Sequence, residues 1–221
     1  NYGSVVFQSG ELITMPFKKY LLKIIRETHK KYPDMGITVS CGEQDFIYLK
    51  KLKAAGASRY LLRIETASEK LYKKLHPNQM SWEKRFQCLK DLKKLNYQVG
   101  TGVMIGLPGQ TDDDLIHDLK FFVNNRFDMF GIGPYVIHKD TPLGGDPNVQ
   151  QWWRENKEKN FNKFLNFLAI LRILLPTVNI AAATACDVFH PLGRIKVLQT
   201  ACNVIMPSVT PKNYRDKYLL Y

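Results

Sequence analysis

The chain has 221 residues, of which 45% are hydrophobic and 24% are charged, and these proportions exclude an intrinsically disordered protein. Its formal net charge of +12 is compatible with a nucleic-acid partner, with a membrane surface, or with a lysine-rich solvated surface. We favour the solvated surface and expect no nucleic-acid or membrane partner, because no aromatic residues are interleaved with the lysines to stack on bases.

The four cysteines, Cys41, Cys88, Cys186 and Cys202, are far apart in the sequence. No two of them form a Cys-x-x-Cys pair, so their spacing predicts neither a zinc site nor an iron-sulfur site. Unpaired cysteines are typical of a reducing, intracellular setting. No apolar run reaches the roughly 18 residues that a membrane-spanning helix needs. The chain has no initiator Met and opens almost directly into a strand, so we expect a fragment of a longer protein.

Short apolar segments alternate with segments of helical periodicity along the whole chain. The expected strands are Val5–Gln8, Ile37–Cys41, Arg59–Ile64, Gln98–Ile105, Met129–Ile137, Val178–Ala182 and Asn203–Met206. The expected helices are Phe17–Lys31, Phe46–Ala54, Glu69–Leu75, Trp82–Leu95, Asp112–Asn124, Gln151–Leu174 and Leu192–Thr200. Gly144–Asn148 is the most loop-like segment, and Thr111-x-x-Asp114 resembles a capping box.

This alternation predicts the α/β class, with a parallel sheet and right-handed crossovers. Seven such units are one short of a closed parallel (β/α)8 barrel of the TIM type, which is the fold we expect. No linker-like segment interrupts the alternation, so we expect one domain over residues 1–221. A doubly wound sheet is the alternative. It is weakened by the first turn, Ser9-Gly10-Glu11, which is not a Gly-x-Gly-x-x-Gly phosphate loop.

Polar residues follow the expected strands, at the edge where parallel barrels bind their ligands. Arg63 and Glu65 flank Ile64, so in an extended strand both side chains would point into the barrel. Such a pair could bind a ligand, or the two residues could satisfy each other.

Glu11 and Glu43 each follow a glycine, and they could either bind an ammonium or hydroxyl group or cap the next helix. Arg85 lies within a helix-period segment, where an arginine is usually exposed. No Ser-His-Asp order, Gly-x-Ser-x-Gly elbow or Cys-His couple supports nucleophilic hydrolysis.

Five segments together resemble the radical S-adenosylmethionine maturases of FeFe-hydrogenase, the HydE family. The segments are Val6–Glu11, Arg59–Ala67, Met104–Thr111, Gly131–Tyr135 and Asn203–Pro207. The resemblance covers essentially the whole chain, although Gly-Leu-Pro-Gly-Gln-Thr alone is shared by many superfamily members. In that family a 4Fe-4S cluster is bound by a Cys-x3-Cys-x2-Cys loop after the first barrel strand. The resemblance therefore implies that the first barrel strand and its cluster loop are missing and that residues 1–221 form a partial barrel, from about strand 2 to strand 8. It also implies that no metal ligand lies in this chain and that the fragment alone is inactive.

The resemblance also implies which residues bind S-adenosylmethionine, namely Ser9, Gly10, Glu11, Glu65 and Arg85. Glu11 resembles the acidic residue of a Gly-Gly-Glu-type motif that binds the methionine ammonium, with Ser9 in place of the first glycine. Arg85 would pair with the methionine carboxylate, as guanidinium geometry favours.

A second set of residues falls on positions that line the family's substrate cavity: Gln8, Thr38, Arg59, Arg63, Thr184, Tyr218 and Tyr221. Arginine and hydroxyl groups at these positions would hold a carboxylate-bearing or iron-cysteine substrate. Ala183-Thr184 stands where the family often has two threonines, so one hydroxyl is missing here.

The implied enzyme cleaves S-adenosylmethionine reductively, with a 4Fe-4S cluster, to a 5'-deoxyadenosyl radical that acts in assembly of the hydrogenase diiron site. Other hydrogenase maturases are expected partners. The expected setting is intracellular, reducing and anaerobic. The sequence does not distinguish the cytoplasm from a hydrogenosome or a mitochondrion-related organelle. The alternatives are a methylornithine synthase or biotin synthase-like radical enzyme, and a noncatalytic small-molecule-binding barrel.

Overall fold

The computed structural model describes residues 2–215 and divides into two compact units. The first unit holds the chain up to Ile64 together with Tyr72–Thr101 and Phe127–Met129, and the second holds Glu65–Leu71, Gly102–Arg126 and the chain from Phe130 onward. Each unit is described by itself below. The expectation of one barrel domain over residues 1–221 stays a prediction.

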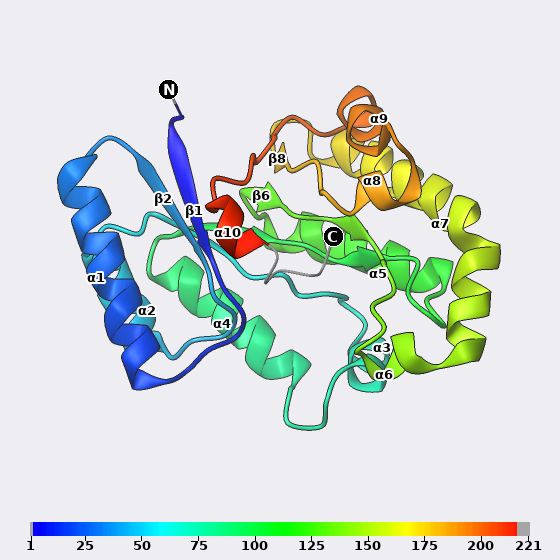
Figure 1. Ribbon diagram of the computed structural model, residues 1–221, viewed down its shortest axis with the longest axis horizontal. Coiled ribbons are helices and arrows are strands. Elements are labelled where there is room, and N and C mark those ends of the chain that lie inside the picture. Colours follow the sequence, from blue (N-terminus) through cyan, green and yellow to red (C-terminus); the bar gives the residue numbers. More distant parts are fainter. Residues whose placement is uncertain (1, 216–221) are drawn as a thin grey trace. The chain divides into compact units, whose positions relative to one another are not determined.

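Four strands pair in parallel to form the sheet of the first unit. They are β1 (Ser4–Gln8), β2 (Gly36–Ser40), β3 (Arg59–Leu61) and β4 (Gln98–Thr101), and they pair in this order. Figure 1 shows β1 beside β2. Thr38 of β2 is in register with Arg59 of β3, which is in register with Gln98 of β4. The parallel pairing confirms the α/β prediction, although β3 ends at Leu61 rather than at Ile64.

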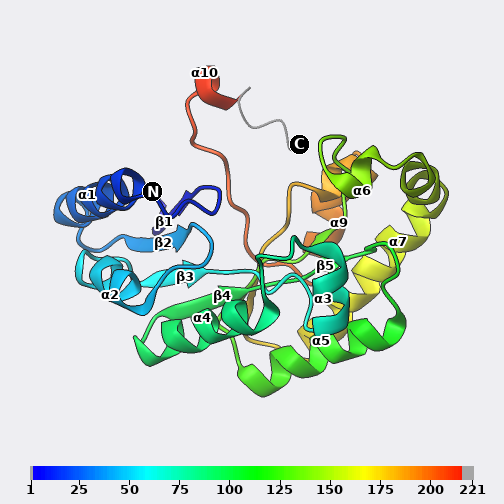
Figure 2. The ribbon, with the colours of Figure 1, turned by 90° about the horizontal axis from the view of Figure 1, so that it is seen from below.

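Helices α1 (Met15–Lys31), α2 (Phe46–Ala54) and α4 (Trp82–Lys94) follow β1, β2 and β3, respectively. Figure 2 shows all three on the same face of the strands. The side chain of Asp45 caps α2 by accepting from Tyr48 N, and Ser81 caps α4 by accepting from Lys84 N. A doubly wound sheet would carry helices on both faces, so the first unit favours the barrel arrangement.

Burial alternates along β3 and the three residues that follow it, as a sheet with one covered face requires. Tyr60, Leu62 and Ile64 are at most 2% exposed, whereas Leu61 and Arg63 between them are partly exposed. The Tyr60 ring packs edge-on against Tyr97 of the same core at 6.0 Å between centroids. The opposite face of the sheet therefore carries the side chains that are available to a ligand.

The second unit contains shorter strands than the sequence predicts. Strand β5 (Met104–Ile105) pairs in parallel with β7 (Gly133–Pro134). Strand β6 (Met129–Phe130) begins with the last residue of the first unit. Its second residue, Phe130, accepts through its carbonyl from the backbone N–H of Ala181, which directly follows β8 (Asn179–Ile180).

The predicted strands Gln98–Ile105 and Met129–Ile137 are wrong as continuous elements, since each is split into two short strands. Within the second unit the break has a local reason: a Cβ on Gly102 would collide with the Gly131 carbonyl, so the backbones approach closely there. The predicted strand Asn203–Met206 is reduced, in the described part of the chain, to one bridge between Val204 and Ala181.

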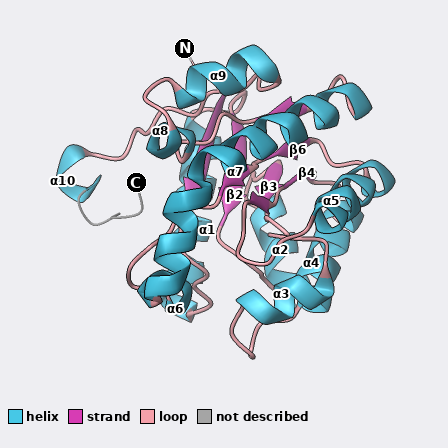
Figure 3. Ribbon diagram, turned by 90° about the vertical axis from the view of Figure 1, so that its right-hand side faces the viewer, coloured by secondary structure: helices cyan, strands magenta, loops and turns pink. Residues whose placement is uncertain are grey.

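The helices of the second unit are α5 (Asp112–Asn125), α6 (Pro142–Gly145), α7 (Pro147–Leu174), α8 (Cys186–Phe189), α9 (Gly193–Thr200) and α10 (Lys212–Arg215). Helix α3 (Glu69–Leu75) begins in this unit and ends in the first. Figure 3 shows α8 and α9 beside α7, and all three are in contact. The predicted capping box of α5 is confirmed, with Thr111 and Asp114 bonding reciprocally.

The prediction that Gly144–Asn148 is loop-like is wrong, because it is divided between two helices. Thr141 accepts from Gly144 N and Asp146 accepts from Asn148 N, so two side-chain caps start these helices. Proline stands at the start of each, where its missing N–H costs nothing. Among residues 2–215, no helix is both long enough and apolar enough to cross a membrane.

Candidate functional site

The side chain of Arg85 joins the segments that follow three adjacent strands. Its Nη2 donates to Glu11 Oε1 at 2.5 Å, its Nη1 to Glu43 Oε1 at 2.9 Å, and its Nε to the Arg63 carbonyl at 2.9 Å. Glu11 follows β1, Glu43 follows β2 and Arg63 follows β3, so all three partners lie at the carboxyl edge of the sheet. We call Glu11, Glu43, Arg85 and the Arg63 carbonyl the Arg85 cluster. It lies where parallel barrels bind their ligands.

Arg85 is 4% exposed, so the expectation of an exposed helix arginine is wrong. The reason lies in the helical period: Arg85, Cys88, Leu89 and Leu92 form the buried stripe of α4, at spacings of three and four residues. A cation in the first turn of such a stripe must find acceptors inside the protein. The two glutamates and the Arg63 carbonyl supply them.

Local backbone geometry brings Glu11 and Glu43 to Arg85. Gly42 has φ = 73°, and a Cβ at this position would lie 2.8 Å from Glu11 Cβ, so only glycine leaves room for the Glu11 side chain. The Tyr60 hydroxyl donates to the Gly42 carbonyl at 2.7 Å. Gln44 Nε2 donates to the carbonyls of Cys41 and Leu12, which ties the segment after β2 to the segment after β1.

The structure also decides between binding and capping for the two glutamates. The N-cap of α2 is Asp45, and the N-cap position of α1 is Thr14. Neither helix is capped by Glu11 or Glu43, whose side chains bond to Arg85 instead. The capping interpretation is therefore wrong for both residues.

The charges of the Arg85 cluster are unequal, since two carboxylates surround one guanidinium. Burial raises the pKa of Glu43 above its usual value, the Arg85 charge opposes this shift, and the Glu11 charge adds to it. The side chains of Glu11 and Glu43 are 42% and 26% exposed, whereas that of Arg85 is 5% exposed. The arrangement is a buried cation covered by two reachable anions.

Four more of the predicted residues lie on β1 and β2 or directly after β1. Gln8 is the last residue of β1 and is in register with Ser40, to whose carbonyl Ser9 N donates. Gly10 is exposed, and a Cβ on it would meet open space. Thr38 is buried in the middle of β2. The structure therefore places Gln8, Ser9 and Gly10 directly before Glu11 at the carboxyl edge, and Thr38 deeper in the sheet.

Arg59 lies at the opposite end of the strands from the Arg85 cluster. It is the first residue of β3, and its Nε donates to Gln98 Oε1, at the start of β4, at 2.6 Å. Its Nη1 lies 2.6 Å from the position that a Cβ on Gly36 would take, at the start of β2. The structure does not bring Arg59 to the cluster, and its role as a substrate contact stays a prediction.

Glu65 belongs to the second unit, and its backbone is not extended. Its φ is 68°, which is left-handed, so the argument that Arg63 and Glu65 point the same way along one strand is wrong. Two hydrogen bonds hold this conformation, from Glu65 N to the Gly102 carbonyl and from Met104 N to the Glu65 carbonyl, both at 3.0 Å. A non-glycine residue held in this region marks a constrained position.

Sequence reasoning missed Asp118, which holds the segment after Glu65. Its Oδ1 accepts from Ala67 N at 2.5 Å and from the Thr66 hydroxyl at 3.4 Å. The side chain is 0% exposed, and burial raises its pKa to about 7. A signal was present: Leu115, Asp118, Leu119 and Phe122 form the apolar stripe of α5, and Asp118 is its charged member.

The remaining predicted residues are Thr184, Tyr218 and Tyr221. Thr184 is exposed in the segment between β8 and α8, and its carbonyl accepts from Asp187 N. Tyr218 and Tyr221 lie outside the described residues.

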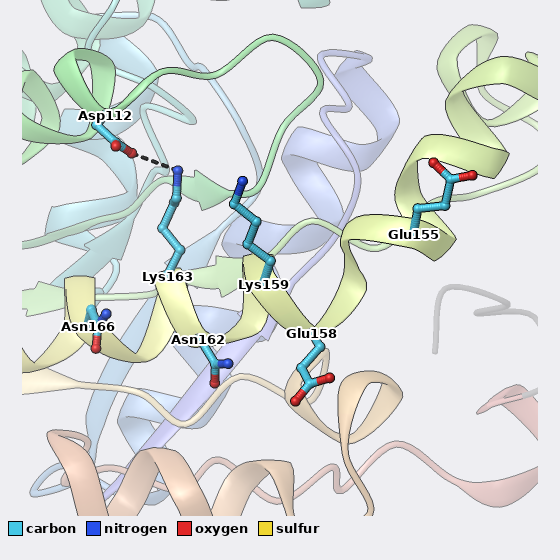
Figure 4. Close-up of a pocket in the computed structure, with 7 residues that line it drawn as sticks. All are labelled: Asp112, Glu155, Glu158, Lys159, Asn162, Lys163 and Asn166. Carbon is cyan, nitrogen blue, oxygen red and sulfur yellow. Dashed lines mark hydrogen bonds and ion pairs between the residues drawn. The ribbon is translucent and has the colours of Figure 1, made fainter.

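A surface pocket of about 700 Å³ lies along α7 in the second unit (Figure 4). It is lined by Asp112, Glu155, Glu158, Lys159, Asn162, Lys163 and Asn166. Lys163 pairs with Asp112 at 2.6 Å, and the Asp112 side chain is 78% exposed. None of the predicted site residues that the structure describes lines this open pocket, so we do not place the function there.

Comparison with known proteins identifies the superfamily of the chain. The model of the radical SAM superfamily matches residues 2–122, a stretch that includes the whole cluster. The chain is 45% identical over 220 residues to the [FeFe] hydrogenase maturase subunit HydE of Thermotoga maritima, covering 99% of this chain and 59% of that protein. It is 27% identical over 198 residues to mitochondrial biotin synthase of Saccharomyces cerevisiae, covering 86% of this chain and 50% of that protein. The chain thus spans less than two thirds of the length of either relative.

Solved structures resemble the chain in fold. Methylornithine synthase superposes with a TM-score of 0.78 at 22% identity, covering 95% of this chain and 58% of that one. The FeFe-hydrogenase maturase HydG superposes with a TM-score of 0.72 at 16% identity, covering 92% and 45%. These likenesses confirm the prediction of a partial parallel barrel of the TIM type. Because the family model matches more than half of the residues, the chain belongs to the radical SAM superfamily.

Proposed function

We propose that this chain is the S-adenosylmethionine-binding part of an enzyme that cleaves S-adenosylmethionine reductively during assembly of the FeFe-hydrogenase diiron site. The observation that carries the proposal is the Arg85 cluster. Glu11 and Arg85, which the family resemblance pairs with the two ends of one amino acid group, lie in direct contact at the carboxyl edge of the strands. The 45% identity to the HydE maturase of Thermotoga maritima supports the choice of reaction.

The cluster fits the methionyl group of S-adenosylmethionine by charge and by donor type. This ligand carries an ammonium, a sulfonium and a carboxylate, and its net charge of about +1 complements two carboxylates and one guanidinium. Glu11 would accept from the ammonium, and Arg85 would bind the carboxylate through two parallel N–H groups. The open space at Gly10 would let the ligand approach the backbone closely.

The described residues do not fit a 4Fe-4S cluster. In the part of the chain that the structure describes, no three His, Cys, Asp or Glu side chains gather to hold a metal ion, and the four cysteines are free and buried. We therefore assign no residue of this chain to the iron and derive no step through it. Bound S-adenosylmethionine would supply the radical chemistry, while this chain would bind it, orient it and exclude water.

The substrate would lie on the sheet face that carries Arg59 and Arg63. Both are at alternate positions to the buried Tyr60, Leu62 and Ile64, so they belong to the face that helices do not cover. Two guanidinium groups and the Thr38 hydroxyl on this face suit a carboxylate-bearing or iron-cysteine substrate. Gln8, Thr184, Tyr218 and Tyr221 complete the proposed set, and other hydrogenase maturases are the proposed partners.

The test is anaerobic and uses the protein that carries this chain together with a Cys-x3-Cys-x2-Cys segment. After reconstitution with iron and sulfide and reduction, we expect release of 5'-deoxyadenosine from S-adenosylmethionine. The release should disappear when the cysteines of that segment are replaced, and active protein should support maturation of apo-hydrogenase. If protein shown to hold the cluster releases no 5'-deoxyadenosine, a noncatalytic binding barrel becomes the better interpretation.

A further inference from the structure

Arg85 already has an acceptor at each of its three nitrogens, which raises the question of how a ligand carboxylate could reach it. Nε, Nη1 and Nη2 donate to the Arg63 carbonyl, Glu43 and Glu11, respectively. The guanidinium has five N–H groups, so these three bonds do not by themselves use up its donors. A ligand carboxylate would, however, bring a third negative group to the same cation, so we expect one of the two glutamates to give up its place when the ligand binds.

The surroundings of the two glutamates differ, and the difference indicates which one moves. Glu43 follows Gly42, whose carbonyl is held by Tyr60, and precedes Gln44, whose side chain bonds to two carbonyls and whose own carbonyl accepts from the Cys88 thiol. Directly afterwards Asp45 caps α2. Glu43 therefore stands on a segment that is bonded on both sides.

The residues beside Glu11 are bonded too, through the Leu12 carbonyl to Gln44 and through the turn from Leu12 N to the Gly10 carbonyl, but Glu11 itself is the more exposed of the two glutamates. It follows Gly10, which is exposed and has open space where a Cβ would be, and its own side chain is 42% exposed against 26% for Glu43. Glycine also lowers the cost of a backbone rearrangement next to it. Glu11 can therefore leave Arg85 at a smaller cost than Glu43 can.

We infer that Glu43 is a positioning residue, which keeps the Arg85 guanidinium in place while Glu11 moves from Arg85 to the ammonium of the incoming ligand. This inference rests on the proposed function, and it deepens that function by assigning a second carboxylate to the methionyl site. Arg85 would remain held by Glu43 and by the Arg63 carbonyl, with Nη2 turned toward the ligand carboxylate. Without Glu43, the guanidinium would lose its fixed orientation when Glu11 leaves.

The test compares two ligands that differ only at the carboxylate. Decarboxylated S-adenosylmethionine keeps the ammonium and the sulfonium but has no group for Arg85 to bind. Dissociation constants for both ligands are measured by equilibrium dialysis on the full protein, for the wild type and for Glu43→Gln. We expect Glu43→Gln to weaken S-adenosylmethionine roughly tenfold and to leave the decarboxylated ligand unchanged. A purely structural role of Glu43 would weaken both ligands equally, and that result would overturn the inference.

Three further variants complete the test. Glu27→Gln is the matched control, since Glu27 is a surface residue of α1 whose side chain is 67% exposed, and it should bind both ligands as the wild type does. Glu43→Asp retains the charge and should bind S-adenosylmethionine more tightly than Glu43→Gln, which covers the case that Glu43→Gln folds poorly. In an Arg85→Gln background, Glu43→Gln should have no additional effect, and an undiminished effect there would contradict an action through Arg85.

The proposed function and this inference can fail separately. Wild-type protein that shows no saturable binding of S-adenosylmethionine would contradict the proposed function. Wild-type protein that binds it, together with a Glu43→Gln variant that binds it equally well, would contradict only the positioning role.

Discussion

Arg85 and Glu11 lie 74 residues apart in the sequence, and the Arg85 guanidinium donates to the Glu11 carboxylate at 2.5 Å. The two residues that are proposed to bind the carboxylate and the ammonium of one ligand thus contact each other. A zwitterionic amino acid group could replace this one ion pair with two, so both protein charges would stay paired on binding.

Replacing Arg85 with alanine should weaken both S-adenosylmethionine binding and the fold. The variant leaves Glu11 and Glu43 without their shared cation, and we expect the free energy of unfolding to fall by about 1–3 kcal/mol because both carboxylates can still reach water. Urea denaturation and equilibrium dialysis measure the two effects. Arg26→Ala, at an exposed position of α1, is the control. A folded Arg85→Ala protein with wild-type affinity would refute the assignment of Arg85.

Replacing Arg63 with alanine should separate substrate from cofactor. Arg85 is held by the backbone carbonyl of Arg63 rather than by its side chain, so the Arg63→Ala variant retains this hydrogen bond. We expect its affinity for S-adenosylmethionine to stay within about twofold of the wild type, a difference below 0.5 kcal/mol. Maturation of apo-hydrogenase in vitro should be lost. If maturation proceeds at the wild-type rate, Arg63 does not bind the substrate.

Replacing Gly42 with alanine should displace Glu11. The left-handed backbone of Gly42 costs an alanine about 1 kcal/mol, and the new methyl group would overlap the Glu11 side chain. We expect weaker S-adenosylmethionine binding together with a lower melting temperature. Gly3→Ala is the matched control, since a Cβ there meets nothing within 4 Å. Equal affinities of Gly42→Ala and Gly3→Ala would show that the position of Glu11 is unimportant for binding.

The buried carboxyl group of Asp118, in the second unit, should make the free energy of unfolding depend on pH. Its pKa is raised from 3.8 in the unfolded chain to about 7 in the folded protein because the carboxyl group is buried. The folded state therefore binds the proton more tightly, and the stabilisation that is present below pH 4 is lost as the pH rises toward 7. The contribution of this shift is on the order of 4 kcal/mol.

Asp118→Asn checks this prediction because the amide is neutral at every pH and can still accept from Ala67 N. Its unfolding free energy, measured in urea between pH 4 and pH 8, should vary less than that of the wild type. Asp113→Asn, at an exposed position in the first turn of the same helix, is the comparison for a nearby loss of charge. A wild type and an Asp118→Asn variant with the same pH profile would mean that Asp118 is ionised in the folded protein.

The sequence by itself determined the class of the fold and the positions of most helices. Helices such as Phe46–Ala54 and Glu69–Leu75 begin and end as predicted, because periodicity and caps are local properties. The family resemblance pointed to Glu11 and Arg85 from short motifs. The limits of the strands around Gly102 could not be predicted, since they depend on the close approach of Gly131, which is a distant segment of the chain.

Only the tertiary structure decided what the charged residues do. Arg85 and Asp118 each lie in an apolar helical stripe, and the sequence could not show which carboxylates or backbone groups would meet them there. The sequence left open whether Glu43 caps α2, and the structure shows that Asp45 caps this helix while Glu43 pairs with Arg85. The physical reason is the same in each case: a buried charge is tolerated only beside its partners, and folding brings those partners from other strands.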